Sequence, residues 1–157
     1  MSKTNAARAL DALGIAYELR EYEVDLEDLS APAVAAKVGI PLDEVWKTLC
    51  VRGEPGKHVG FAVLPGGAEL DLKAYARLAE LKTAELAALK DVTLLTGYVR
   101  GGVTALAAKK AYPVFADEMI LALDRVCVSA GIRGLQMVLA PADYVRATGA
   151  KLGPLSR

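Results

Sequence analysis

The chain has 157 residues, enough for one domain with a full hydrophobic core. It carries 19 Lys and Arg against 19 Asp and Glu, and this zero net charge excludes a protein that holds nucleic acid through a general basic excess. The N-terminal stretch MSKTNAARAL lacks the apolar core of a signal peptide, and no apolar run approaches the roughly 18 residues of a membrane span. We therefore expect a single domain over residues 1–157, located in the cytoplasm and without membrane contact.

Two cysteines, Cys50 and Cys127, lie in apolar, strand-like runs far apart in the sequence. Buried core thiols are the favoured interpretation, and a disulfide or a reactive thiol is the alternative. The one histidine, His58, follows a turn and is typical of a hydrogen-bonded histidine at a strand edge. One histidine and two distant cysteines do not make a zinc-ligand pattern, so we expect neither a metal nor another cofactor.

Periodicity and capping residues predict the elements of the first half of the chain. In chain order they are a helix at 3–13, a half-buried strand at 15–22, a helix at 31–38 capped by Ser30, a helical turn at 41–45, and strands at 47–52 and 58–64. The Pro/Gly-containing turn at 53–56 predicts that the last two strands form a hairpin.

In the second half, Asp71 and Thr83 are suitable N-cap residues for helices at 71–79 and 83–89. Strands are expected at 92–95, 113–116, 125–129 and 135–139, and a final helix at 141–148. Strands and helices mix without a regular βαβ order. The sequence therefore predicts an α+β fold, or a mixed sheet wrapped by helices, over a doubly wound one.

The stretch VWKTLC at 45–50 places one lysine, Lys47, in an apolar strand. A buried ammonium is costly unless it is paired or used. Alternation puts Lys47 on the same face as Val45 and Leu49, which favours a position at a pocket wall. Three interpretations stay open: a solvent-facing lysine, a partner of a buried carboxylate, and a cation that faces a ligand.

Two glycine-bearing loops are the other candidate site features, Gly97-Tyr98-Val99-Arg100-Gly101-Gly102 and Ser129-Ala130-Gly131-Ile132-Arg133-Gly134. Glycines let backbone N–H groups approach a ligand closely, and such groups suit a carbonyl oxygen or a developing oxyanion. Tight turns at strand ends are the alternative interpretation. The sequence contains no G-x-S-x-G, no P-loop and no G-x-G-x-x-G after a strand, so the common hydrolase and nucleotide-binding signatures are missing.

Five segments of this chain follow one another in the order that they have in a known family: VWKTLC, Leu64-Pro65, Leu70-Asp71-Leu72-Lys73, TGYVRGGVTALAAKK and VSAGIRGLQMVLAPADYVRAT. Together they resemble the YbaK/EbsC family of aminoacyl-tRNA deacylases. That family includes free-standing Cys-tRNA(Pro) deacylases and the editing domain of bacterial prolyl-tRNA synthetases. The resemblance spans about residues 10–148 and implies a mixed, barrel-like β-sheet surrounded by helices.

The resemblance also implies an activity, the removal of mischarged cysteine from tRNA(Pro). The substrate thiol is then its own nucleophile, and the protein positions the ester and stabilises the oxyanion. The implied catalytic residues are Lys47, Gly101 and Gly102. The implied substrate-binding residues are Tyr22, Thr48, Gly97, Thr104, Ser129, Gly131, Arg133 and Gln136. The expected partner is the 3′ CCA end of aminoacyl-tRNA, with prolyl-tRNA synthetase as a further candidate; of the early-strand tyrosines, Tyr22 matches better than Tyr17.

Two departures from the family pattern bear on the substrate. Val103-Thr104-Ala105 follows the paired glycines where free-standing Cys-type enzymes often carry Ser-Pro, and Gln136 stands where an acid often follows GxRGL. These departures leave open an Ala-type or broader deacylase. A tRNA 3′-end binding module without turnover and an unrelated small-molecule α+β protein also stay open.

Overall fold

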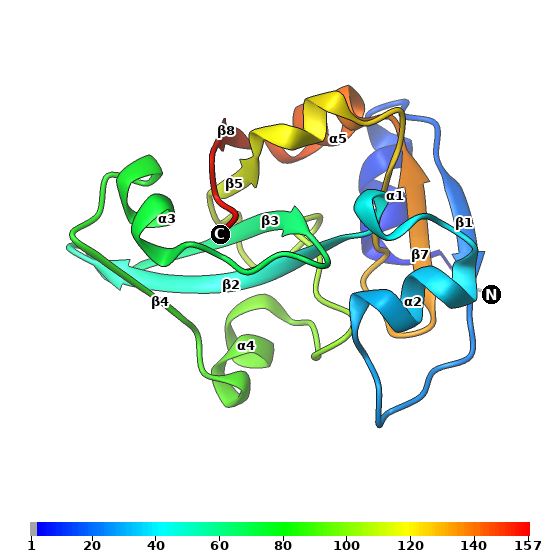
Figure 1. Cartoon of the computed structure of the whole chain (residues 1–157), viewed down its shortest axis with the longest axis horizontal. Coiled ribbons are helices and arrows are strands. Elements are labelled where there is room, and N and C mark those ends of the chain that lie inside the picture. Colours follow the sequence, from blue (N-terminus) through cyan, green and yellow to red (C-terminus); the bar gives the residue numbers. More distant parts are fainter. Residues whose placement is uncertain (1–2) are drawn as a thin grey trace.

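The computed structural model describes residues 3–157, which form two β-sheets flanked by helices (Figure 1). The larger sheet has five strands in the order β4-β2-β3-β5-β8, and the smaller has three in the order β1-β7-β6. The strands are β1 Glu18–Glu21, β2 Trp46–Glu54, β3 His58–Pro65, β4 Thr83–Leu86, β5 Val114–Asp117, β6 Val126–Ser129, β7 Leu135–Leu139 and β8 Lys151–Gly153. The helices are α1 Asn5–Ala12, α2 Ala31–Val38, α3 Leu72–Leu78, α4 Leu89–Thr96 and α5 Pro141–Thr148, with 3-10 turns η1 Leu42–Glu44 and η2 Glu118–Ala122.

Strands β2 and β3 form the predicted hairpin and are the longest strands of the larger sheet. Their antiparallel register pairs Lys47 with Leu64 and Gly53 with His58. β4 pairs antiparallel with only the second half of β2, from Val51 to Glu54. The first half of β2 therefore has an open edge on the β4 side.

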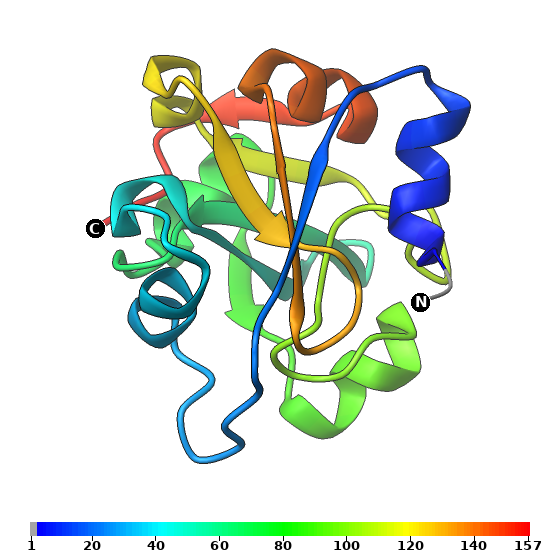
Figure 2. The same ribbon diagram turned by 90° about the vertical axis from the view of Figure 1, so that its right-hand side faces the viewer.

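The two sheets approach each other at one parallel bridge, between Val45 and Cys127. Strands β2 and β6 otherwise belong to different sheets, and Figure 2 shows the molecule from the side on which the smaller sheet faces the viewer. The main hydrophobic core contains buried side chains of both sheets and of α1 and α5, among them Trp46, Phe61, Met137 and Tyr144. Burying apolar side chains of this size contributes about 1.5–3 kcal/mol each.

The predicted capping residues act as expected at two helices. Ser30 Oγ accepts a hydrogen bond from the Ala33 N–H at the start of α2, and Asp71 Oδ1 accepts one from the Ala74 N–H at the start of α3. Gly39 and Gly149 end α2 and α5 in the left-handed conformation. Local sequence signals therefore determine where these helices begin and end.

Two predicted elements are wrong. Residues 83–89, predicted to be a helix, contain β4, because Thr83–Leu86 pairs with the edge of β2 and tertiary pairing overrides the capping signal at Thr83. Residues 92–95, predicted to be a strand, lie within α4. There Val92 and Thr96 are buried one turn apart and Leu94 is exposed, which is a helical period.

No sequence pattern predicted β8, which adds a parallel strand to β5. Buried Asp117 holds the segment that follows β8: its Oδ2 accepts hydrogen bonds from the N–H groups of Leu155 and Ser156 and from the Ser156 hydroxyl, and its Oδ1 accepts one from the Met119 N–H. The predicted mixed α and β fold is confirmed, but the sheets are not closed into a barrel. Within residues 3–157, no helix has the length and apolar character that crossing a membrane requires.

Candidate active site

A pocket of about 420 Å³ lies along the open edge of β2. Its lining comes from five regions of the chain: the start of α2 with the two residues before it, the first half of β2, Gly66 after β3, the segment from Leu86 through α4 to Val103, and the ends of β6 and β7. Five of the predicted site residues line it: Lys47, Thr48, Gly101, Ser129 and Gln136. Residues far apart in the sequence therefore meet in one cavity of the size that small-ligand sites have.

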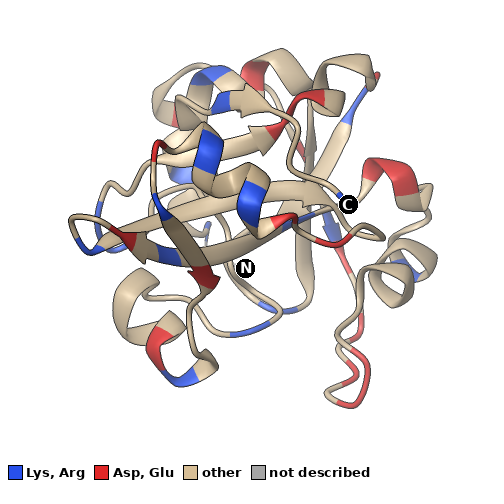
Figure 3. Ribbon diagram, turned by 60° about the vertical axis from the view of Figure 1, so that its left-hand side comes forward, with Lys and Arg blue, Asp and Glu red and all other residues tan. Residues whose placement is uncertain are grey.

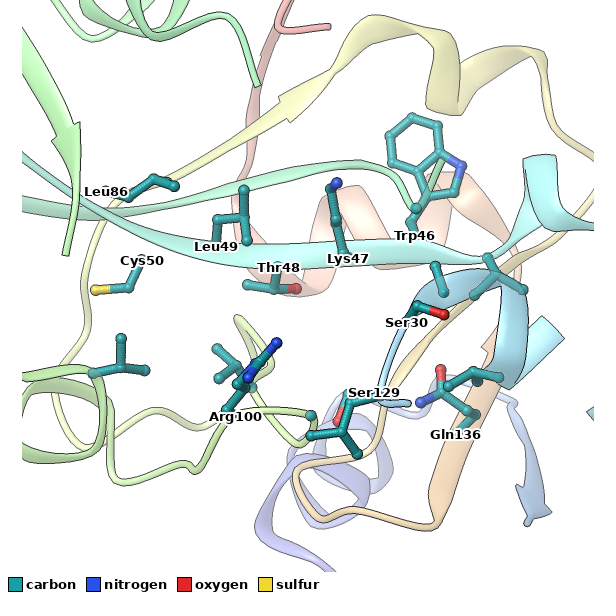
Figure 4. A pocket seen from close by; sticks show the side chains of 18 of the residues that line it. Ser30, Trp46, Lys47, Thr48, Leu49, Cys50, Leu86, Arg100, Ser129 and Gln136 are labelled. Atoms are coloured by element: carbon teal, nitrogen blue, oxygen red, sulfur yellow. The ribbon is translucent and has the colours of Figure 1, made fainter. Parts of the chain in front are cut away.

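Lys47 lies half-buried on the pocket wall. Figure 4 shows Lys47 and Leu49 extending from one side of β2, whereas Thr48 and Cys50 extend from the other, toward Arg100 and Ser129. Lys47 Nζ donates a hydrogen bond to the backbone carbonyl of Ala68, in the segment after β3. Burial lowers the pKa of Lys47, and the nearby Glu69 carboxylate raises it in part. The ammonium is thus desolvated and held by a neutral carbonyl.

The backbone of Thr48 lies at the open edge of β2. Ala87 donates its N–H to the Cys50 carbonyl on the β4 side, at 2.9 Å. Backbone groups of alternate strand residues point to the same side, so the N–H and C=O of Thr48 also face this side. β4 begins its pairing only at Val51, so among the described strands none pairs with Thr48 there. These peptide groups, which the sequence did not single out, are available to a ligand in the pocket.

The glycine-loop amides differ in what they can bind. The N–H of Gly102 donates to the Val99 carbonyl at 2.8 Å, and the N–H of Gly131 donates to Ser129 Oγ at 3.1 Å. Both are therefore used inside their own loops. The Gly101 N–H has no partner in residues 3–157, and Gly101 lines the pocket at a φ of +87°. Of the three amides, that of Gly101 is the one free for a substrate oxygen.

Two polar residues at the ends of β6 and β7 form the far wall. Ser129 and Gln136 are register partners in the smaller sheet, and both line the pocket. Gln136 is buried, and its Oε1 accepts a weak hydrogen bond from the Cys127 thiol at 3.7 Å. The wall therefore offers a hydroxyl and an amide.

The other predicted substrate-binding residues are not among those lining the pocket. Tyr22 packs against the cluster around α2, whereas the Tyr17 hydroxyl donates to Asp11 beside α1. Gly97 caps the C-terminus of α4. Thr104 is fully buried, and its hydroxyl accepts a hydrogen bond from the Leu106 N–H. Arg133 Nε donates to the Arg100 carbonyl at 2.7 Å, so it joins the two glycine loops.

Some lining residues were not predicted as site residues. Ser30 was assigned only a capping role, Cys50 only a place in the core, and Arg100 was part of a candidate loop without being selected. Three apolar lining residues were also not identified, because the secondary structure predicted for residues 83–89 and 92–95 is wrong: Leu86, Leu89 and Val92. Position within a glycine loop is the one sequence signal that could have identified Arg100.

The pocket contains few groups that could transfer protons. Among the described lining residues there is no Asp, Glu or His. The Cys50 thiol borders the pocket, but burial raises its pKa and keeps it protonated near neutral pH. The pocket can therefore hold a ligand through peptide groups, hydroxyls and one ammonium, but its described lining has no nucleophile–base pair.

Comparison with known proteins identifies the family. The aminoacyl-tRNA editing domain family matches residues 29–147, a stretch that includes the whole pocket lining. The chain belongs to the aminoacyl-tRNA editing domain family. Its resemblance to YbaK/EbsC proteins is thereby confirmed.

Individual members of the editing-domain family support the same conclusion. The chain is 36% identical over 154 residues to a protein of Enterococcus faecalis named "Putative Cys-tRNA(Pro)/Cys-tRNA(Cys) deacylase EbsC", covering 98% of this chain and 93% of that protein. A solved structure described as "a putative trans-editing enzyme for prolyl tRNA synthetase" has a TM-score of 0.84 and 25% identity, with 99% of each chain covered. The hypothetical protein APE2540 has a TM-score of 0.89 and 26% identity, with 98% of this chain and 100% of that chain covered.

Proposed function

We propose that the chain is an aminoacyl-tRNA deacylase that removes cysteine mischarged on tRNA(Pro). The observation that carries this proposal is the composition of the pocket: it has donors for an ester oxygen but no carboxylate or imidazole among its described lining residues. Such a site suits a substrate that brings its own nucleophile. The family match over residues 29–147 and the name of the 36% identical relative support the same substrate class.

In the proposed reaction the cysteine thiol of the substrate loses its proton and its sulfur attacks the ester carbonyl carbon. The S–C bond forms, the ester C–O bond breaks, and the ribose oxygen of the tRNA leaves with a proton. Water then hydrolyses the released cyclic thioester to cysteine. Negative charge develops on the carbonyl oxygen, and the Gly101 N–H and the Lys47 ammonium are the proposed donors to it.

Lys47 has to change partner for this role. Its Nζ, at the end of a long side chain, binds the Ala68 carbonyl, which is a neutral acceptor. A developing oxyanion is a better acceptor for an ammonium than a peptide carbonyl, because the hydrogen bond is then charge-assisted on both sides. Because Lys47 extends from the side of β2 opposite to Arg100 and Ser129, its side chain has to swing around the open edge of the strand to reach an oxygen held by Gly101.

A broader or Ala-type deacylase is the second candidate, and Gln136 is the observation that favours it. This buried amide provides no charge for a substrate ammonium, and the lining around it is mainly apolar. A small apolar pocket separates side chains that differ by one methyl group by only about 1–3 kcal/mol. Prolyl-tRNA synthetase is the proposed partner that presents the tRNA, because one structural neighbour is described as a trans-editing enzyme for that synthetase.

The test is deacylation of tRNA(Pro) charged in parallel with Cys, Ala, Ser and Pro, by wild type, Lys47→Ala and Lys73→Ala. Lys73 is an exposed lysine of α3, which makes it a matched control. We expect release of Cys alone, a loss of roughly 100-fold or more in Lys47→Ala, and no change in Lys73→Ala. Release of Ala or Ser as well would show that the protein is a broader deacylase. Binding of tRNA without release of any amino acid would show that it is a binding module, and would overturn the proposal.

A further inference from the structure

The mouth of the pocket separates two segments of opposite charge. The acidic loop, defined here as residues 21–28, contains five carboxylates and no Lys or Arg: Glu21, Glu23, Asp25, Glu27 and Asp28. The segment from Leu86 to Ala116 contains one carboxylate, Asp91, and four cations: Lys90, Arg100, Lys109 and Lys110. We call these four residues the basic rim. The zero net charge of the chain therefore hides a strong local asymmetry.

Contacts place both segments at the pocket. Leu29 and Ser30, which follow the acidic loop directly, line the pocket on one side, and Leu89 and Arg100 line it on the other. The two sides come close at Gly101, where an added Cβ atom would lie 3.3 Å from Leu29 Cδ1. Figure 3 shows the acidic residues gathered on a long loop at one lower corner of the molecule, with basic residues along the neighbouring segments.

The basic rim extends outward from the pocket along α4. Lys90 follows Leu89, a pocket-lining residue, at the start of this helix. At its far end the Lys109 N–H donates to the Thr96 carbonyl at 2.9 Å, which holds Lys109 and Lys110 against the C-terminus of α4. The three lysines are exposed. They therefore mark a track that starts at the pocket mouth and spans the length of α4.

The charges of the rim are not neutralised by the protein. None of its four cations forms an ion pair in the part of the chain that the structure describes, and Asp91 is engaged by Arg52 at 3.7 Å. Leu89 and Leu94 lie on α4 with Lys90 and are 65% and 70% exposed. Exposed cations without ion-pair partners suit a nucleic acid, whose phosphates pair with lysine.

We propose that the acceptor stem of the tRNA reaches the pocket over α4 and the basic rim, and that the acidic loop excludes it from the opposite side. This inference rests on the proposed function, because it takes the 3′ end of the RNA to be in the pocket. The acidic loop repels phosphates, so the two segments together fix the direction from which the RNA enters.

The test uses the charge reversals Lys90→Glu, Lys109→Glu and Lys110→Glu combined in one variant. The matched control is Lys73→Glu/Arg77→Glu on α3, whose exposed cations lie outside the pocket lining. Two substrates are compared, cysteinyl-tRNA(Pro) and a cysteinylated CCA trinucleotide, which has no acceptor stem to lie along α4. Binding of an acceptor-stem minihelix that ends in CCA and carries no amino acid is measured by fluorescence anisotropy at several salt concentrations.

We expect the triple variant to raise KM for the tRNA about tenfold or more, with kcat unchanged and with the trinucleotide cleaved as by wild type. Its minihelix affinity should fall, and the slope of log Kd against log salt should decrease by about 2 to 3, near one for each lost phosphate contact. The control variant should match wild type. An unchanged triple variant, or a loss that appears in the α3 variant instead, overturns the proposed direction of entry.

The minihelix measurement keeps this inference separate from the proposed function. If wild type releases no amino acid from any substrate, the deacylase proposal fails. The binding data then still decide whether RNA lies on the basic rim. If wild type cleaves the trinucleotide but shows no salt-dependent binding of the minihelix, the deacylase proposal stands. The proposal that RNA binds along the basic rim is then overturned.

Discussion

Arg133 ties the two glycine loops together, because its Nε donates to the backbone carbonyl of Arg100 at 2.7 Å. The carbon chain of Arg133 also covers Gly101, since an added Cβ atom there would lie 3.4 Å from Arg133 Cγ. The sequence predicts a substrate-binding role for Arg133, and that role stays a prediction. From these contacts we infer a positioning role as well, in which Arg133 holds the loop that carries the Gly101 N–H.

Arg133→Ala should therefore reduce deacylation by about tenfold through kcat, because an unsupported loop misplaces the Gly101 donor. Stability should fall by no more than about 1.5–3 kcal/mol, the range of one hydrogen bond to a charged group. Single-turnover kinetics and urea unfolding measure the two effects. Arg133→Lys restores a donor to the carbonyl and should recover part of kcat. Full activity of Arg133→Ala would show that Arg133 is not needed to position the Gly101 N–H.

Gly102→Ala should force the two loops apart. The new Cβ atom would lie 3.0 Å from the Ile132 carbonyl carbon and 3.1 Å from the Arg133 nitrogen, and neither backbone atom can move alone. We expect at least a tenfold loss of kcat/KM and a loss of about 1–3 kcal/mol in unfolding free energy. Gly67→Ala is the control, since its nearest neighbour is the flexible side chain of Leu42 at 3.3 Å. Equal activity of both variants would contradict the prediction.

Asp117→Ala should release the C-terminal segment. The substitution leaves four donors without their acceptor: the N–H groups of Met119, Leu155 and Ser156, and the Ser156 hydroxyl. Because Asp117 is only 3% exposed, water cannot replace it without local opening, and we expect a loss of about 3 kcal/mol in unfolding free energy. Chemical denaturation measures it, with exposed Asp124→Ala as the control. A loss below about 1 kcal/mol would show that these bonds contribute little.

Cys127 should make stability depend on pH in the alkaline range. Burial raises the pKa of the Cys127 thiol from 9.0 to about 11. The folded state thus keeps a proton that the unfolded chain releases. The stabilisation is fully present below about pH 9 and disappears as the pH rises toward 11, and a shift of this size corresponds to about 3 kcal/mol.

Urea unfolding of wild type and Cys127→Ala at pH 8, 9, 10 and 11 isolates this contribution. The difference between the two proteins should shrink as the pH rises, because only wild type contains the thiol. Parallel stability curves would show that Cys127 has an ordinary pKa.

Deacylation by the Cys50→Ala/Cys127→Ala double variant should stay within a few-fold of wild type, since neither thiol is the proposed nucleophile. A folded but inactive double variant would point to a protein thiol mechanism.

Much of this protein follows from its sequence. Ser30 and Asp71 start helices because a side-chain oxygen can satisfy an N–H three residues later, which is a purely local interaction. The alternation around Lys47 and the turn at 53–56 specified the central hairpin for the same local reasons. The glycine loops and VWKTLC also carried the family resemblance, which the comparisons confirm.

The tertiary structure alone decided the rest. Thr83 looks like a helix cap, but β4 forms because the edge of β2 offers hydrogen-bonding partners that no local pattern can reveal. The open edge at Thr48, the use of the Gly102 and Gly131 amides inside their loops, and the role of Arg133 all depend on which backbone groups already have partners. Residue types state what a site can bind, but only the packed chain determines which donors and acceptors remain free to bind it.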